Sequence, residues 1–185
     1  MIPHVRAITF LRPMSSGRTK PCLMVCEDDD GNQEEIVVKL RSGIETREMG
    51  STSEVMASLL ARDMDLPVPE PRLVEIESGF DRAVPNPDFV RRVRDSVGWS
   101  FGSVRLPSGF TTWPKGKSIP QLLRQRALEV LAFDTIIQNP DRRKGNPNVL
   151  WKGDELFIYD HELSLTFFLP QIGWQPPWTG RALSF

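Results

Sequence analysis

Acidic and amide side chains gather around a predicted hairpin near the end of the sequence. Its strands are the apolar runs 149–151 and 156–159, joined by a polar turn. Counting outward along the hairpin places Asp160 opposite Asn146 or Pro147, depending on the register, and antiparallel partners lie about 5 Å apart at Cα. The sequence therefore predicts that an acid and an amide meet at the open end of this hairpin.

Asn148 and Asp141 lie in the same polar loop and approach the same point. Carboxylate and amide oxygens are hard ligands of the kind that Mg²⁺ accepts, so these side chains suit a magnesium site. The other interpretation is a polar hairpin mouth at which Asn and Asp only stabilise turns. Spacing alone leaves both interpretations open.

A second pair of charged residues lies far upstream. Lys39 belongs to an apolar strand, 36–40, and shares a face with Val37, which is unusual for a lysine without an anionic partner. A lysine in water is the alternative. Glu54 follows Ser51 by three residues, the spacing of a capping box at a helix start, and an ion pair with Lys39 is the competing interpretation.

One acid stands where the helical pattern predicts the core. Apolar residues at helical spacing mark a long helix that ends before Pro140: Leu123, Ala127, Val130, Leu131 and Ile137. Asp134 falls on their stripe. Because a buried carboxylate must be hydrogen-bonded or paired, we expect loop N–H groups or the guanidinium of Arg142 to hold it, so that Asp134 braces the loop after the helix.

The elements that position these residues change in type along the chain. Strands are predicted at 5–10, 23–26, 36–40 and 72–76, with a helix from Ser51 to the residues before Pro67. The predicted fold class is α+β in two lobes: a β-rich N-lobe at 1–78 and a reduced, helical C-lobe at 119–185. Residues 79–118 carry Gly, Pro, Ser and scattered aromatics, and predict an irregular connection or lid.

Composition excludes several classes of protein. The 185 residues include 23 Lys and Arg against 24 Asp and Glu, whereas a dedicated nucleic-acid binder is strongly basic. The apolar runs are too short to span a membrane, and no signal peptide is visible. The two cysteines, Cys22 and Cys26, are too few for a disulfide scaffold and predict buried thiols and a cytoplasmic location. The oligomeric state stays open.

Four ordered stretches carry a family resemblance. They are residues 35–40, Glu54 with the turn at 66–69, residues 133–148, and residues 158–161. Together they resemble the HipA-like kinases and, more distantly, the phosphatidylinositol 3- and 4-kinases. Those families have a catalytic Asp-Arg, an Asn five residues later, and a metal-binding Asp after a strand. The resemblance covers residues 5–77 and 119–168 and implies a protein-kinase-like fold.

The resemblance implies an enzyme that transfers the γ-phosphate of ATP, with Mg²⁺, to a hydroxyl, most simply that of a protein Ser or Thr. Asp141 would orient this hydroxyl or accept its proton. Asn146, with Asn148 as a competitor, and Asp160 would hold Mg²⁺. His161 would lie beside the metal without binding it, since Mg²⁺ prefers oxygen.

The same resemblance assigns the nucleotide site to the first part of the chain. Lys39 would bind the α- and β-phosphates, and Glu54 would hold Lys39 in place. Gly17, with Ser16, would let backbone N–H groups approach phosphates, although an ordinary hairpin turn is the alternative.

Family members usually continue into further helices after the metal-binding Asp, whereas residues 161–185 here are rich in proline. We therefore expect a minimal kinase, a face covered by a partner protein, or reduced activity. The alternative function is a nucleotide-binding pseudokinase that acts as a protein-interaction or regulatory module. Some HipA-like kinases are toxins, and the sequence leaves that role open.

Overall fold

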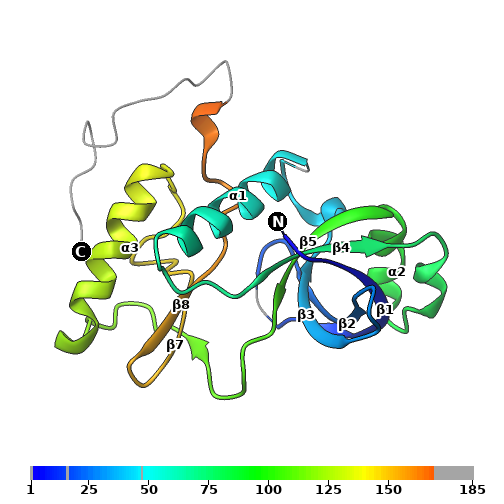
Figure 1. Ribbon diagram of the computed structural model, residues 1–185, viewed down its shortest axis with the longest axis horizontal. Helices are drawn as coiled ribbons and strands as arrows, with labels where there is room; N and C mark the ends of the chain where they lie inside the picture. Colours follow the sequence, from blue (N-terminus) through cyan, green and yellow to red (C-terminus); the bar gives the residue numbers. More distant parts are fainter. Residues whose placement is uncertain (1, 16, 47, 169–185) are drawn as a thin grey trace. The chain divides into compact units, whose positions relative to one another are not determined.

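The structure is a computed structural model that describes residues 2–15, 17–46 and 48–168. It divides into two units (Figure 1). The first comprises Met1–Val55 and Pro69–Leu106, and the second comprises Met56–Val68 and Pro107–Phe185. The chain is of mixed α and β structure, as predicted.

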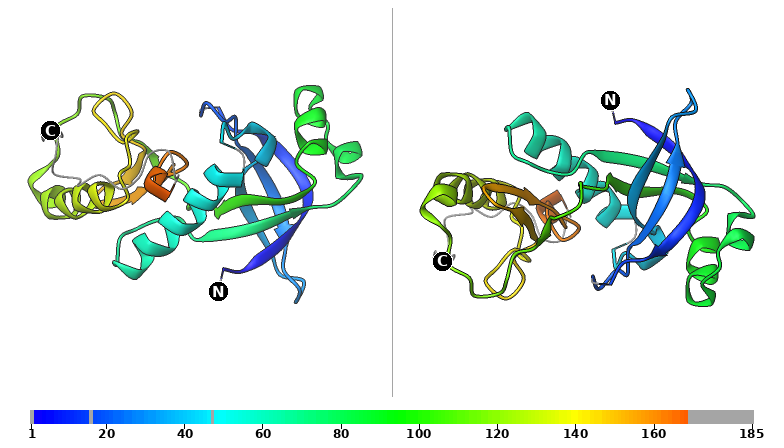
Figure 2. Two further views of the ribbon diagram at one scale, coloured as in Figure 1. Left: turned by 90° about the horizontal axis from the view of Figure 1, so that it is seen from above. Right: turned by 90° about the horizontal axis from the view of Figure 1, so that it is seen from below.

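A closed barrel forms the first unit, with its strands in the order β1-β2-β3-β5-β4 (Figure 2). The strands are β1 (His4–Pro13), β2 (Cys22–Glu27), β3 (Gln33–Lys39), β4 (Pro71–Ile76) and β5 (Gly98–Val104). Adjacent strands are antiparallel except β1 and β4, whose parallel pairing closes the barrel. Alternate residues of each strand point inward, which explains the apolar alternation seen in the sequence.

Both cysteines are free, fully buried and part of the barrel core. Burial raises the pKa of each thiol to about 12. The thiols therefore stay protonated at neutral pH and behave as small apolar side chains, as the sequence predicted.

The stretch 79–118 is not an irregular connection, so that prediction was wrong. It contains η2 (Phe80–Ala83), helix α2 (Pro87–Arg94), strand β5 and the short strand β6 (Thr111–Thr112). Asn86 caps α2 by accepting from the N–H of Asp88, and a proline occupies the first turn. The helix has only eight residues, and Phe89 and Val93, four positions apart, are the two that it buries, so its apolar pattern is too short to be recognised in the sequence.

Glycine also hides β5 in the sequence. A Cβ on Gly102 would lie 2.5 Å from Cγ2 of Ile36 and 2.6 Å from Cγ2 of Val74. The methyl groups of these two side chains fill the space beside Gly102, so that only glycine fits, although glycine normally argues against a strand.

Helix α1 (Glu48–Asp63) begins earlier than predicted. Ser51 therefore lies inside the helix and is not its N-cap, which rules out the capping box with Glu54. The helix ends before the turn at 66–69, as expected from the prolines there.

The second unit contains helix α3 (Arg124–Ile136), preceded by η3 (Gln121–Leu123), and a sheet in the order β6-β7-β8. Strands β7 (Val149–Lys152) and β8 (Glu155–Ile158) form the predicted hairpin, and η4 (Thr166–Phe168) follows. The core of this unit includes Phe133, Ile137 and Ile158, all fully buried.

Among the residues that the structure describes, no helix combines the length and apolar character needed to cross a membrane.

Candidate functional site

In the first unit, the side chains of Lys39 and Glu54 form an ion pair. Lys39 is the last residue of β3, and Glu54 lies on α1. Their exposed fractions are 9% and 1%. A lysine in water and a capping glutamate are both excluded by this geometry. Because both side chains are buried, the ion pair holds the Lys39 ammonium in one position. Removing either charge would leave the other buried without this partner, which is costly.

In the connection from β1 to β2, residues 17–20 form a turn that begins at Gly17. Gly17 has φ +109°, and its carbonyl accepts from the N–H of Lys20 at 3.0 Å. Met14 N–H donates to the carbonyl of Pro21 at 2.8 Å and closes the loop. Ser16 lies outside the described residues. The phosphate role of Gly17 stays a prediction, because this geometry also suits an ordinary hairpin turn.

In the second unit, Asp134 is buried at 5% exposure and its carboxylate is held at both oxygens. Arg142 donates from Nε to Oδ2 at 2.7 Å, and Asn139 donates from Nδ2 to Oδ1 at 3.2 Å. The prediction that Asp134 braces the loop after the helix, through Arg142, is confirmed.

Arg142 also connects the loop to the β7–β8 hairpin. Its Nη1 donates to the carbonyl of Asn148 and, at 3.3 Å each, to those of Pro147 and Tyr159. Its side chain is only 8% exposed. One guanidinium thus joins the end of α3 to the segments that enter and leave the hairpin.

His161 completes this cluster at 1% exposure. Its Nε2 lies 3.1 Å from Nη2 of Arg142. Because a guanidinium only donates hydrogen bonds, Nε2 must be the acceptor, which leaves a neutral ring with its proton on Nδ1. The ring also packs edge-on against Phe133. The role of His161 beside a metal stays a prediction.

Asp141 is oriented by the side-chain amides of Asn146 and Asn148, the two alternative candidates for the magnesium ligand. Its Oδ2 accepts from Nδ2 of Asn146 at 2.9 Å and lies 3.4 Å from Nδ2 of Asn148. Asn139 fixes the backbone by accepting from the N–H of Asp141 at 3.0 Å. Within the described ranges, no donor is bonded to Oδ1 of Asp141, so this oxygen can accept a hydrogen bond from a ligand.

The hairpin register places Lys152 opposite Glu155 and Val149 opposite Ile158. This is the second of the two predicted registers, the one in which counting outward leads from Asp160 to Pro147. The paired strands end at Val149 and Ile158, and beyond them Tyr159 N–H donates to the carbonyl of Asn148 at 3.1 Å. Asn146 and Asn148 each contact Asp141. Asp160 follows β8, which pairs with β7, the strand after their loop.

Asn148 and Asp160 both adopt positive φ angles, +48° and +66°. Asn and Asp tolerate this left-handed region better than other residues with a Cβ, yet it still costs energy. Such residues cluster at functional sites, where the surrounding contacts hold them in place. At Asn148, Arg142 supplies such a contact by donating to its carbonyl.

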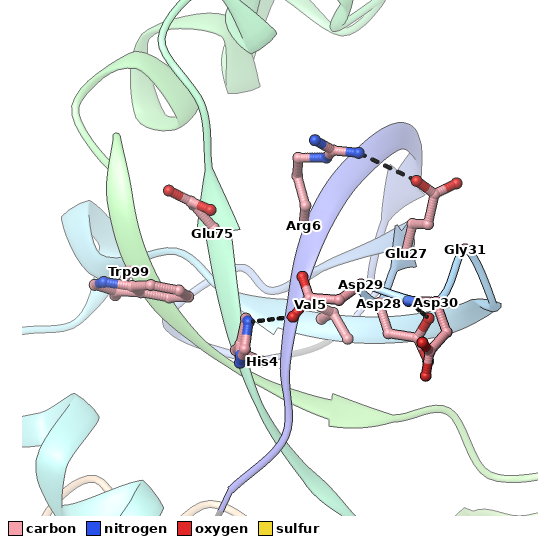
Figure 3. A pocket seen from close by; sticks show the side chains of 10 residues that line it. All are labelled: His4, Val5, Arg6, Glu27, Asp28, Asp29, Asp30, Gly31, Glu75 and Trp99. Carbon is pink, nitrogen blue, oxygen red and sulfur yellow. Dashed lines mark hydrogen bonds and ion pairs between the residues drawn. The ribbon is translucent and has the colours of Figure 1, made fainter.

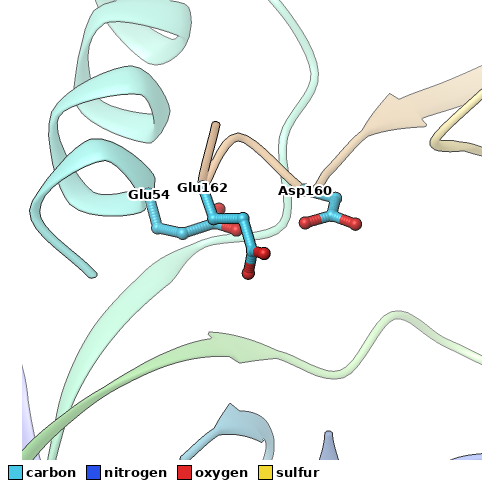
Figure 4. A group of neighbouring side chains, drawn as sticks. All are labelled: Glu54, Asp160 and Glu162. Carbon is cyan, nitrogen blue, oxygen red and sulfur yellow. The ribbon is translucent and has the colours of Figure 1, made fainter. Parts of the chain in front are cut away.

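Sequence reasoning missed Glu162, which lies two residues after Asp160 (Figure 4). An oxygen of its carboxylate lies within 4.8 Å of one from Asp160, and Glu162 is 7% exposed. The only signal was the spacing of two acids around His161. The two carboxylates add to the hard oxygen donors available for a divalent cation.

A cavity of about 610 Å³ opens on the outside of the barrel (Figure 3). It is lined by acids of the β2–β3 turn, by Glu75 and by the half-exposed ring of Trp99. His4 reaches Asp29 across it, with 3.1 Å between Nε2 and Oδ2. None of the predicted site residues that the structure describes lines this cavity.

A family model of HipA-like kinases matches residues 7–168. This range contains both the Lys39–Glu54 pair and the whole loop and hairpin that surround Asp141. A comparison with curated proteins found no match. Because the family model spans most of the sequence, the chain belongs to the HipA-like kinase family.

Proposed function

We propose that this member of the family is an ATP- and Mg²⁺-dependent kinase that transfers the γ-phosphate to the hydroxyl of a protein Ser or Thr. Family membership supports kinase-type chemistry. The observation that carries the finer proposal is the orientation of Asp141, which has one oxygen held by loop amides and the other available to a ligand.

Phosphoryl transfer needs positioning and charge neutralisation more than covalent help from the protein. Oδ1 of Asp141 would accept the hydrogen bond of the acceptor hydroxyl and align its oxygen with the phosphorus. Lys39 would contact the α- and β-phosphates, and Glu54 would keep its ammonium in place. Arg142 would keep the loop in the geometry that aligns Asp141.

The donor set fits magnesium. Asn146 uses its Nδ2 to donate to Asp141, which leaves its Oδ1 as a ligand atom, and Asp160 and Glu162 offer carboxylate oxygens close together. When bound, Mg²⁺ neutralises phosphate charge during transfer. Asn148 remains the competitor of Asn146, because its amide also lies near Asp141.

We also propose the two-lobed arrangement of kinases for this chain. The nucleotide-binding lobe, expected from the sequence at residues 1–78, would comprise the barrel unit, residues 1–55 and 69–106. Residues 119–185 would belong to the lobe that carries the catalytic loop. The barrel with Lys39 at the end of β3 supports the first assignment, and the loop between α3 and β7 supports the second. The two free, buried thiols support a cytoplasmic location.

Removing either member of the Lys39–Glu54 pair is expected to weaken nucleotide binding. Lys39→Ala removes the phosphate contact, and loss of one charge-assisted hydrogen bond, about 1.5–3 kcal/mol, lowers affinity at least about tenfold. Glu54→Gln keeps Lys39 and has a smaller effect. Titration calorimetry with a non-hydrolysable ATP analogue and Mg²⁺ measures both, with the exposed Lys115→Ala as control.

The buried Lys39–Glu54 pair also stabilises the fold, so the melting temperature of each variant is measured as well. If Glu54→Gln lowers the melting temperature but leaves nucleotide affinity unchanged, the pair serves the fold alone.

The kinase proposal itself is tested by transfer of label from γ-labelled ATP to the protein itself and to proteins of a lysate. We expect label in the presence of Mg²⁺, on Ser or Thr, and its loss with EDTA or in Asp160→Asn. The matched control is Asp154→Asn, in the exposed turn of the same hairpin. Nucleotide binding by the wild type without any transfer would favour the pseudokinase instead.

A further inference from the structure

Arg92 of α2 fastens the loop between β1 and β2 by long-range hydrogen bonds. Its Nη1 donates to the carbonyl of Lys20 at 3.2 Å, and its Nη2 donates to that of Thr19. These two residues close the turn that begins at Gly17. The residues that meet here are about 70 positions apart in sequence, so the loop is held by tertiary contacts as well as by its own turn.

Arg92 is committed to this loop rather than to an acid. Over the part of the chain that the structure describes, no carboxylate forms an ion pair with it, and its guanidinium stacks over the ring of Phe89, 5.1 Å from the centroid. Phe89 in turn packs against Phe10 of β1, with 5.3 Å between ring centroids. The helix is therefore anchored to the barrel on the strand that leads into the loop.

Gly43 makes the contact possible. A Cβ at this position would lie 2.0 Å from Nη2 of Arg92 and 2.8 Å from the carbonyl oxygen of Thr19. Its φ is not in the left-handed region, so close packing explains this glycine and backbone conformation does not. Any larger residue would separate Arg92 from the loop.

The same turn of α2 also holds the segment that follows Lys39. The carbonyl of Arg92 accepts from the hydroxyls of Ser42 and Ser96 at 2.8 Å each. Ser96 Oγ accepts from the N–H of Ser42 at 3.0 Å. Ser42 lies in η1 (Arg41–Gly43), which begins two residues after Lys39. Arg92 thus contacts both segments expected near the phosphates. Its side chain bonds to the turn after Gly17, and its backbone carbonyl bonds to the segment after Lys39.

We propose that Arg92 is a positioning residue for nucleotide binding, whose guanidinium holds the turn at residues 17–20, here called the Gly17 loop, in the conformation that receives the phosphates. The proposal rests on the kinase function proposed above. Ordering of a loop before the ligand arrives lowers the entropy lost on binding, so Arg92 acts through the loop backbone without touching the nucleotide.

The test compares Arg92→Ala and Gly43→Ala with the control Arg91→Ala. Arg91 is the preceding residue of α2, and its own side chain is 89% exposed. The first readout is limited trypsin digestion with mass spectrometry of cleavage between Arg18 and Thr19, because Thr19 is buried at 7% exposure in the intact loop. Both loop variants are expected to be cut about tenfold faster there than the wild type, since opening of a loop controls cleavage. Arg91→Ala is expected to behave as the wild type.

The second readout separates positioning from structure. With the loop released, KM for ATP should rise about tenfold while kcat changes less than about twofold, because Lys39 and Asp141 are untouched. Arg92→Lys restores one of the two contacts and should give intermediate values. A role in folding alone would lower the melting temperature and the active fraction and leave KM unchanged.

Unchanged cleavage in both loop variants overturns the proposal, as does faster cleavage with an unchanged KM. If the wild type binds no ATP, the kinase function fails and the nucleotide role of Arg92 fails with it. The cleavage rates then still report whether Arg92 holds the loop, so the two failures can be told apart.

Discussion

An Asp141→Asn variant is expected to bind ATP and Mg²⁺ as the wild type does. Its rate of phosphate transfer is expected to fall by at least about 100-fold. The asparagine oxygen can replace Oδ2 as the acceptor for Asn146, so the loop keeps its shape. Its amide nitrogen then occupies the position of Oδ1 and donates where the acceptor hydroxyl needs an acceptor. Orientation and proton acceptance are both lost without a change in size.

Initial rates with γ-labelled ATP measure this effect, and calorimetry with a non-hydrolysable analogue measures binding. Asp154→Asn, at the exposed end of the β7–β8 hairpin, makes the same chemical change outside the site. Wild-type transfer by Asp141→Asn would remove Asp141 from the reaction and leave its contacts with Asn146 and Asn148 as turn structure only.

The sequence predicted contacts that depend on regular periodicity. Asp134 falls on the apolar stripe of α3 because helical positions repeat every 3.6 residues, and its burial then requires a donor close in sequence. The hairpin around Asp160 was predictable for the same reason, since side chains in paired strands alternate and register follows from the turn. The sequence left open only whether Trp151 or Lys152 lies opposite Glu155, and in the structure it is Lys152.

Contacts between segments distant in sequence were not predictable. Nothing in the residues around Thr19 indicates that Arg92, on a helix of only eight residues, donates to its carbonyl. Glu54 shows the same limit. Local spacing to Ser51 suggested a cap, whereas tertiary packing places Glu54 against Lys39. Family resemblance, which carries tertiary information, favoured the right partner.

Arg142, in the loop that contains Asp141, has more partners than the sequence indicates. Sequence reasoning identified it as one donor to Asp134, but four further contacts link it to Pro147, Asn148, Tyr159 and His161. Backbone carbonyls carry no residue-specific signal, so the number of its partners could not be read from their identities. In the structure this arginine is the element that joins the loop of Asp141 to the strand before Asp160.

The second large effect is therefore expected at the Asp134–Arg142 pair. Asp134→Asn retains the shape but loses the charge-assisted hydrogen bond, about 1.5–3 kcal/mol. The melting temperature should fall by roughly 5–10 °C. Arg142→Ala leaves a buried carboxylate unpaired and should cost about 3–5 kcal/mol. Arg143→Ala, at the next and exposed position, is the matched control.

Loop order should fail before the fold does, because both residues connect the loop to the rest of its unit and neither belongs to the apolar core around Phe133. Hydrogen exchange should accelerate at residues 139–148 in Asp134→Asn at temperatures where α3 stays protected. A double variant, Asp134→Asn with Arg142→Ala, removes both partners, so its loss should be smaller than the sum of the two single losses. Additive losses, or loop exchange at the wild-type rate, would show that the loop is ordered by its own turn and that the pair stabilises only the end of α3.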